Sequence, residues 1–199
     1  MKIKLTILAS FLYLIILFIT YYIHINFFNI NVIFYSALYD VLIATIISII
    51  LIYKMPPFRL FNRFEKNQFL IIWLLTGYAL AISLPTLLDR SLSFYLLEKI
   101  QQRGGGIEQK SFEEIFTNEY MIEFRLIDVR LTEQIESGTI EIKDGCVKLT
   151  KTGKILVLFS SYFRHNLLSK HRLLMGEYTD ELTNPFRNSN SNISYVCNQ

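Results

Sequence analysis

Charged side chains are scarce in the first 88 residues of this 199-residue chain. That stretch has six Lys or Arg and two acids, whereas residues 89–199 have the remaining fourteen basic and fifteen acidic side chains. The net charge of +3 therefore comes from the first part (6 − 2 = +4), because the second part is close to neutral (14 − 15 = −1). Such a neutral second part lacks the basic excess that is usual in a nucleic-acid-binding domain.

Cysteine, histidine, proline and glycine are also few. Cys146 and Cys197 have neither metal-ligand spacing nor a CxxC motif, which argues against a zinc site or a thioredoxin-like site. We expect one buried thiol and one thiol in the tail. The three histidines have no carboxylate or cysteine at ligand spacing, so neither a metal nor any other cofactor is predicted. Low proline and glycine with abundant Ile, Phe, Asn and Lys are typical of an AT-rich bacterial gene.

Long apolar runs fill the first part of the chain, although 52% hydrophobic residues overall is already high for a soluble domain. The runs are residues 5–23, 32–53 and 69–88. At about 1.5 Å per residue, each can cross a hydrocarbon core of about 30 Å. No small-x-small cleavage site follows the first run, which we interpret as an uncleaved anchor. The sequence thus predicts a transmembrane domain of three helices over residues 1–88, in a bacterial inner membrane.

The loops between these runs indicate an orientation. The first loop has no Lys or Arg, whereas the second, at residues 54–68, has four. Short loops rich in Lys and Arg are retained on the cytoplasmic side. The N-terminus and second loop are therefore expected inside, and residues 89–199 outside, in the periplasm. Basic residues just after the third run, Arg90, Lys99 and Arg103, favour the opposite orientation.

Asp40 is the one charged residue inside the second apolar run. A carboxylate at this depth costs a few kcal/mol unless it faces protein or water, so intramembrane acids are candidates for function. Asp89 and Arg90 follow the third run on the same side, and an Asp40–Arg90 pair is geometrically possible. The sequence predicts a polar site of Asp40, Asp89 and Arg90. The alternative is a structural role, in which Asp40 bonds to a nearby hydroxyl such as Ser36.

The second part of the chain reads as a helix, a hairpin and another helix. Residues 121–137 carry apolar side chains at helical spacing, and Gly138 ends the pattern. Two alternating segments, residues 139–143 and 146–150, flank Asp144-Gly145, which predicts a hairpin with a type I′ turn. A short strand is expected upstream, at residues 107–110, and a last helix downstream, at residues 151–174.

This order of elements, with the phrase GTIEIKDGCVKLTKTG, resembles the winged-helix DNA-binding superfamily over residues 91–170. The resemblance implies a small α+β domain, at residues 89–175, in which residues 121–137 form the recognition helix and Asp144-Gly145 the wing tip. That helix has four acids against two arginines, so it should repel DNA. We therefore predict an interaction helix for protein contacts, with the candidate residues Arg125, Asp128, Arg130 and Glu133.

The last helix has a continuous apolar run at residues 155–159 that is too short to span a bilayer. It could complete the winged-helix core, pack on the three spans, or lie on the bilayer with its basic end at the headgroups. The membrane-surface residues in that case are Arg164, Lys170 and Arg172. Residues 176–199 are expected to form a polar, partly flexible tail.

No set of residues converges on a reaction, so the sequence favours a non-enzymatic protein. The function predicted is that of an integral inner-membrane accessory protein, with the bilayer and another membrane protein as partners and nucleic acid disfavoured. Envelope glycan or polysaccharide assembly is a setting that would suit it. Two alternatives stay open: a membrane-tethered winged-helix transcription regulator, and a small membrane enzyme with a polar site at Asp40, Asp89 and Arg90.

Overall fold

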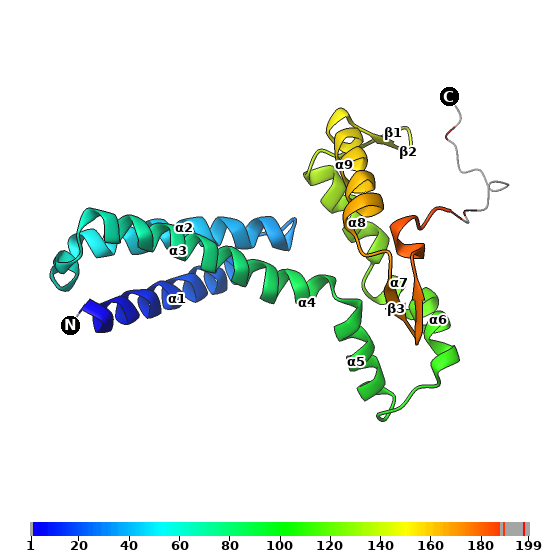
Figure 1. The fold of residues 1–199 in the computed structure, drawn as a ribbon, viewed down its shortest axis with the longest axis horizontal. Coiled ribbons are helices and arrows are strands. Elements are labelled where there is room, and N and C mark those ends of the chain that lie inside the picture. The colour runs from blue at the N-terminus through cyan, green and yellow to red at the C-terminus, as the bar shows by residue number, and fades with distance from the viewer. Residues whose placement is uncertain (1, 188, 190–196, 198–199) are drawn as a thin grey trace. The chain divides into compact units, whose positions relative to one another are not determined.

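The structure is a computed structural model, and it describes residues 2–187, 189 and 197. The chain divides into two compact units, residues 1–129 and 130–199, with the boundary inside one helix. The first unit begins with long helices, α1 (Lys2–Phe27), α2 (Ile33–Lys54) and α3 (Arg63–Ala81), which Figure 1 draws in blue to green.

Three helical stretches among the described residues are long and apolar enough to cross a membrane: Lys2–Phe27, Ile33–Lys54 and Arg63–Arg90. The predicted spans are thereby confirmed as helices, and the chain is membrane-associated. A 3₁₀ turn, Pro56–Leu60, joins α2 to α3.

A capping box starts α3. The Asn62 side chain accepts from the Glu65 amide at 2.8 Å, and the Glu65 carboxylate accepts from the Asn62 amide at 2.8 Å. Glu65 also pairs with Lys2 at 2.7 Å, which ties the first turn of α1 to the start of α3.

Aromatic stacking joins α1 to α3 midway along the membrane unit. The rings of Tyr13 and Trp73 stack with their centroids 5.1 Å apart, and the Tyr13 hydroxyl donates to the Trp73 carbonyl oxygen at 2.8 Å. Gly77 lies one turn further along α3, where a Cβ atom would collide with Tyr13 and Val41. A small residue is needed there because the three helices approach closely.

A π-helical turn, Ile82–Thr86, continues α3 into α4 (Leu87–Arg90). Pro85 has no amide to donate to the carbonyl of Ala81, four residues earlier. The Thr86 hydroxyl donates to that carbonyl instead, at 2.8 Å. In a membrane this replacement matters, because a bare carbonyl in hydrocarbon costs several kcal/mol.

Short helices complete the first unit. After α5 (Leu92–Gln102) come a 3₁₀ turn (Gln109–Ser111), α6 (Phe112–Ile115), a π turn (Phe116–Tyr120) and α7 (Met121–Glu123). They pack around the buried side chains of Tyr95, Ile115 and Tyr120. The strand expected at residues 107–110 does not form, since the 3₁₀ turn occupies the second half of that stretch.

The helix expected at residues 121–137 is broken in two. After α7, Arg125 takes a positive φ of 45°, and α8 (Leu126–Glu136) begins at the next residue. The break sets the Phe124 ring against Tyr95 and Tyr120, with centroids 5.3 and 5.2 Å away. Aromatic packing here outweighs the continuity of the helix.

The second unit contains the predicted hairpin. Strands β1 (Ile140–Lys143) and β2 (Cys146–Leu149) pair antiparallel, with Lys143 opposite Cys146. Positive φ angles of 53° at Asp144 and 74° at Gly145 fit the type I′ turn that was predicted. The hairpin leads into α9 (Lys151–Leu167), which the Thr150 side chain caps by accepting from the Gly153 amide at 3.1 Å.

The last helix is shorter than expected and is followed by a second hairpin. It ends at Leu167 instead of residue 174, and β3 (Arg172–Leu174) pairs with β4 (Glu177–Thr179) across Met175-Gly176. A 3₁₀ turn, Glu181–Thr183, follows. The expected tail at residues 176–199 therefore begins with ordered elements, and residues 188, 190–196 and 198–199 lie outside the described part.

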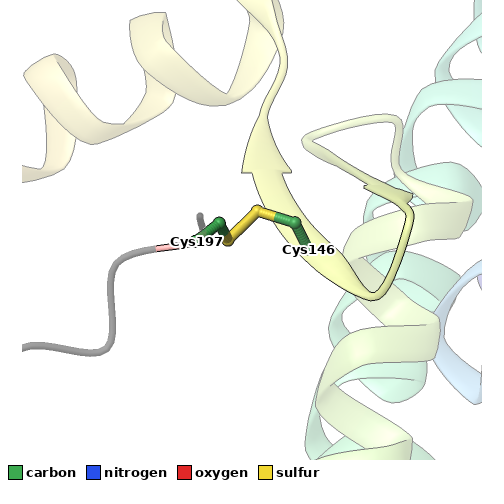
Figure 2. Close-up of a disulfide and its surroundings, with 2 residues drawn as sticks. All are labelled: Cys146 and Cys197. Carbon is green, nitrogen blue, oxygen red and sulfur yellow. A yellow bond between two sulfur atoms is a disulfide. The ribbon is translucent and has the colours of Figure 1, made fainter. Parts of the chain in front are cut away.

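A disulfide joins Cys146 on β2 to Cys197 (Figure 2). The expectation of two free thiols was wrong, because the partners are 51 residues apart and no local spacing reveals the pairing. Taken together, the chain is mostly helical, with three long apolar helices followed by small two-stranded sheets.

Candidate intramembrane site and extramembrane surface

Asp40 forms a buried polar pair with His24 of α1. Its carboxylate Oδ1 lies 2.8 Å from His24 Nδ1, and the Asp40 side chain is only 2% exposed. The partner is therefore not the Ser36 hydroxyl or Arg90 that the sequence suggested. His24 was also considered isolated, since it is sixteen residues from Asp40 and on a different helix. It lies one turn before the end of α1, and Asp40 lies two turns into α2.

The other carboxylate oxygen, Asp40 Oδ2, is buried and has no hydrogen-bond partner among the described residues. It lines a cavity of about 300 Å³ between the three long helices. The lining residues are Leu17, Phe18, Tyr21, Ala37, Asp40, Val41, Gly77, Leu80, Ala81, Leu84, Pro85 and Leu88. Apart from Asp40 and Tyr21, these side chains carry no polar atom, so the cavity is an apolar space with one carboxylate in its wall.

Asp89 and Arg90, the other two predicted site residues, lie at the end of α4. Tyr21 interacts electrostatically with both Asp40 and Asp89, so the two acids share one end of the membrane unit. Arg90 is exposed where this helix ends. The structure thus brings the two acids near one tyrosine, and His24 replaces Arg90 as the basic partner of Asp40.

A second polar cluster, centred on Lys99, was missed by the sequence analysis. Lys99 is 5% exposed, and its Nζ lies 2.8 Å from Glu123 Oε1 and 2.9 Å from Glu119 Oε2. The Tyr95 hydroxyl donates to Glu123 at 2.8 Å. These contacts raise the pKa of Lys99, chiefly through Glu123 and Glu119, and the Lys99 ammonium lowers the pKa of each carboxyl.

Every hydrogen-bonding group of this Lys99 cluster that the structure describes is matched by another. We interpret it as a structural lock between α5 and α7. The sequence offered one signal for it, since Lys99 and Tyr95 are four residues apart on one helical face.

The four residues of the predicted interaction helix form two ion pairs along the chain. Arg125 Nη2 lies 2.7 Å from Asp128 Oδ2, and Arg130 Nη1 lies 2.7 Å from Glu133 Oε2. Each pair joins residues three apart, so the charges neutralise one another locally. This leaves little net charge with which to attract a partner at these positions.

Large apolar side chains are exposed along α9. Gly153 is its only buried residue, and the exposed ones include Leu158 at 72% and Phe159 at 63%. The full exposed set is Ile155, Leu156, Val157, Leu158, Phe159, Tyr162, Phe163 and Leu167. Of the three basic residues predicted near it, Arg164 lies on α9, Lys170 in the following loop and Arg172 at the start of β3.

No group of three or more potential ligands that could hold a metal ion occurs among the described residues. No protein-family model matches the chain, and no curated protein or solved structure is significantly similar to it. The physical features of the molecule are therefore the basis for any functional proposal.

Proposed function

We propose that this chain is an integral membrane accessory protein whose extramembrane part binds another protein through α9. The observation that carries the proposal is the exposure of large apolar side chains along most of that helix. Contiguous apolar surface of this kind is rare on soluble monomers and typical of interaction sites.

The pattern of α9 favours a protein groove over a bilayer surface. Residues 155–159 are all apolar, and at about 100° per residue five consecutive residues cover the full circumference of a helix. A helix that lies in a membrane interface needs a polar face toward water. A helix that is apolar all round is normally surrounded by other protein.

Charge further defines the partner. Lys151, Lys154 and Arg164 lie on α9, which has no acidic residue. A groove with an apolar floor and acidic residues near both ends would complement this helix.

The disulfide supports a periplasmic location for the extramembrane part. Disulfides persist in oxidising compartments and are rare in the bacterial cytosol. This agrees with the loop charges, which put residues 54–68 inside. A cytoplasmic DNA-binding regulator would need the reverse orientation and a basic recognition helix.

We also propose a winged-helix-like arrangement for residues 91–170. The hairpin, its type I′ turn and the capped helix after it support this proposal. The missing strand at residues 107–110 and the break at Arg125 make it a divergent member, used for contact with protein.

The test compares two variants of the full chain, expressed in a bacterial membrane and extracted in mild detergent. Leu158→Glu places a charge in the apolar run, whereas Lys154→Glu, one turn earlier on the same helix, changes charge outside that run. We expect the wild type and Lys154→Glu to migrate as a larger complex and Leu158→Glu to migrate alone. A wild type that extracts only as a monomer, or one released equally by both substitutions, would contradict the proposal.

Sidedness is measured separately, with a reporter active in one compartment fused after Gln199. A cytoplasmic signal would refute the periplasmic location, and with it the role assigned to the disulfide.

A further inference from the structure

The membrane unit contains a binding site that is independent of the proposed contact through α9. We propose that the cavity lined by Asp40 binds a long-chain lipid alcohol, with its hydroxyl donating to Asp40 Oδ2 and its chain lying along α3. The juxtaposition of an apolar cavity and one buried acceptor is the basis of this assignment.

Asp40 Oδ2 requires a hydrogen-bond donor. Its side chain is 2% exposed, and its first oxygen, Oδ1, is already occupied by His24. A carboxylate oxygen in a low-dielectric environment that accepts no hydrogen bond costs several kcal/mol. The membrane offers no bulk water to satisfy it, so the donor must come with a ligand that enters from the bilayer.

A water molecule fits this position poorly. Buried waters typically make about three hydrogen bonds to polar groups. The cavity wall offers side-chain oxygens only from Asp40 and Tyr21, and the remaining lining side chains are apolar. A hydroxyl on an alkyl chain needs only one acceptor, and the chain makes favourable contact with the rest of the wall.

The cavity has the size and the opening that an alkyl chain requires. Its volume of about 300 Å³ corresponds to roughly ten water-sized groups of about 30 Å³ each. Among the lining residues, Leu84 is 43% and Leu88 52% exposed, on the helix whose flanks face the hydrocarbon. The chain of the ligand can therefore enter sideways from the lipid.

A neutral donor suits the site better than a cation. His24 already places a basic group against Asp40, and an ammonium would bring a further charge into the hydrocarbon at a cost of a few kcal/mol. The geometry therefore points to a hydroxyl and not to an amine.

The test uses the full chain in vesicles of dioleoylphosphatidylcholine, a lipid without a hydroxyl group. Three photoreactive probes share a ten-carbon diazirine chain and end in a hydroxyl, an ammonium or a methyl group. We expect the alcohol to label peptides from residues 77–88 about tenfold more efficiently than the methyl probe, since one hydrogen bond to a charged group contributes on that order. Equal labelling by these two probes would overturn the site, and stronger labelling by the amine would overturn the choice of a neutral donor.

Matched variants locate the ligand. Leu84→Trp fills the cavity, whereas Leu75→Trp places the same ring on α3 at a position that is 64% exposed and outside the cavity. The first should abolish the preference for the alcohol and the second should preserve it. Identical labelling of both variants would show that the probe binds elsewhere. Asp40→Leu should reduce alcohol labelling to the level of the methyl probe, and if that variant fails to insert, the tryptophan pair and the probe series still decide the question.

Discussion

Removing the disulfide should loosen the β1–β2 hairpin of the second unit. The perturbation is the double substitution Cys146→Ser with Cys197→Ser, or reduction of the wild type. A loop of 51 residues closed by a cross-link loses chain entropy equivalent to about 4 kcal/mol in the unfolded state. The described residues of this unit that are buried are Thr139, Gly153 and Thr183, so no large apolar core offsets the loss.

Hydrogen exchange of the full chain in detergent, read by mass spectrometry, measures this effect. Amides of residues 140–149 exchange when the hairpin opens, and the population of open molecules follows the free energy of opening. A change of about 4 kcal/mol corresponds to roughly a thousandfold faster exchange, or to complete loss of protection if the unit is less stable than that. Peptides from α2 are the internal control and should be unaffected.

Equal protection of the hairpin in the oxidised wild type, the reduced wild type and the double variant would refute this reasoning. It would mean that contacts other than the disulfide hold β1 and β2 together. Faster exchange in α2 as well would show a general loss of folding and not a local one.

Two further predictions concern the first unit. Replacing Trp73, which is 2% exposed, by Ala should destabilise the helical bundle by about 3 kcal/mol, measured by detergent-induced unfolding, whereas an Ala at Leu75 should have little effect; similar losses would refute the role of the aromatic stack. The Lys99 cluster should make the packing of α5 and α7 dependent on pH. The lowered pKa values of Glu119 and Glu123 mean that their contribution is complete above their ordinary value of 4.5 and is lost as the pH falls through the lower folded values. The raised pKa of Lys99 means that its contribution is complete below 10.5 and is lost only at higher pH. Proteolysis within residues 103–118 should therefore accelerate at both extremes, and a rate that stays flat below pH 4.5 would contradict the assignment.

The elements that sequence alone predicted are those with local causes. An uninterrupted apolar run specifies a membrane helix, and Asp144-Gly145 specifies a type I′ turn because both residues must take positive φ. The second hairpin had a similar signal in Met175-Gly176, flanked by alternating residues, but it lay beneath a stronger helical pattern.

The features that were missed depend on residues far apart in the chain. His24 meets Asp40 only after α1 and α2 pack side by side, and Cys146 meets Cys197 across 51 residues. The break at Arg125 depends on aromatic rings from two other helices. Of the candidate site, the sequence therefore identified the intramembrane acid, but not its partner or the cavity beside it.

The π turn in the third span sets which side chains reach its polar end. Buried positions on α3 are four residues apart from Phe69 to Trp73, Gly77 and Ala81, and the next one, Thr86, comes after five. The turn thus accommodates one surplus residue. Deleting Ser83 would leave a regular helix and rotate everything beyond it by about 100°. The facing of Asp89 and Arg90 is consequently a matter of counting: it depends on how many residues precede them in the span, and a one-residue change of length would alter it more than most substitutions.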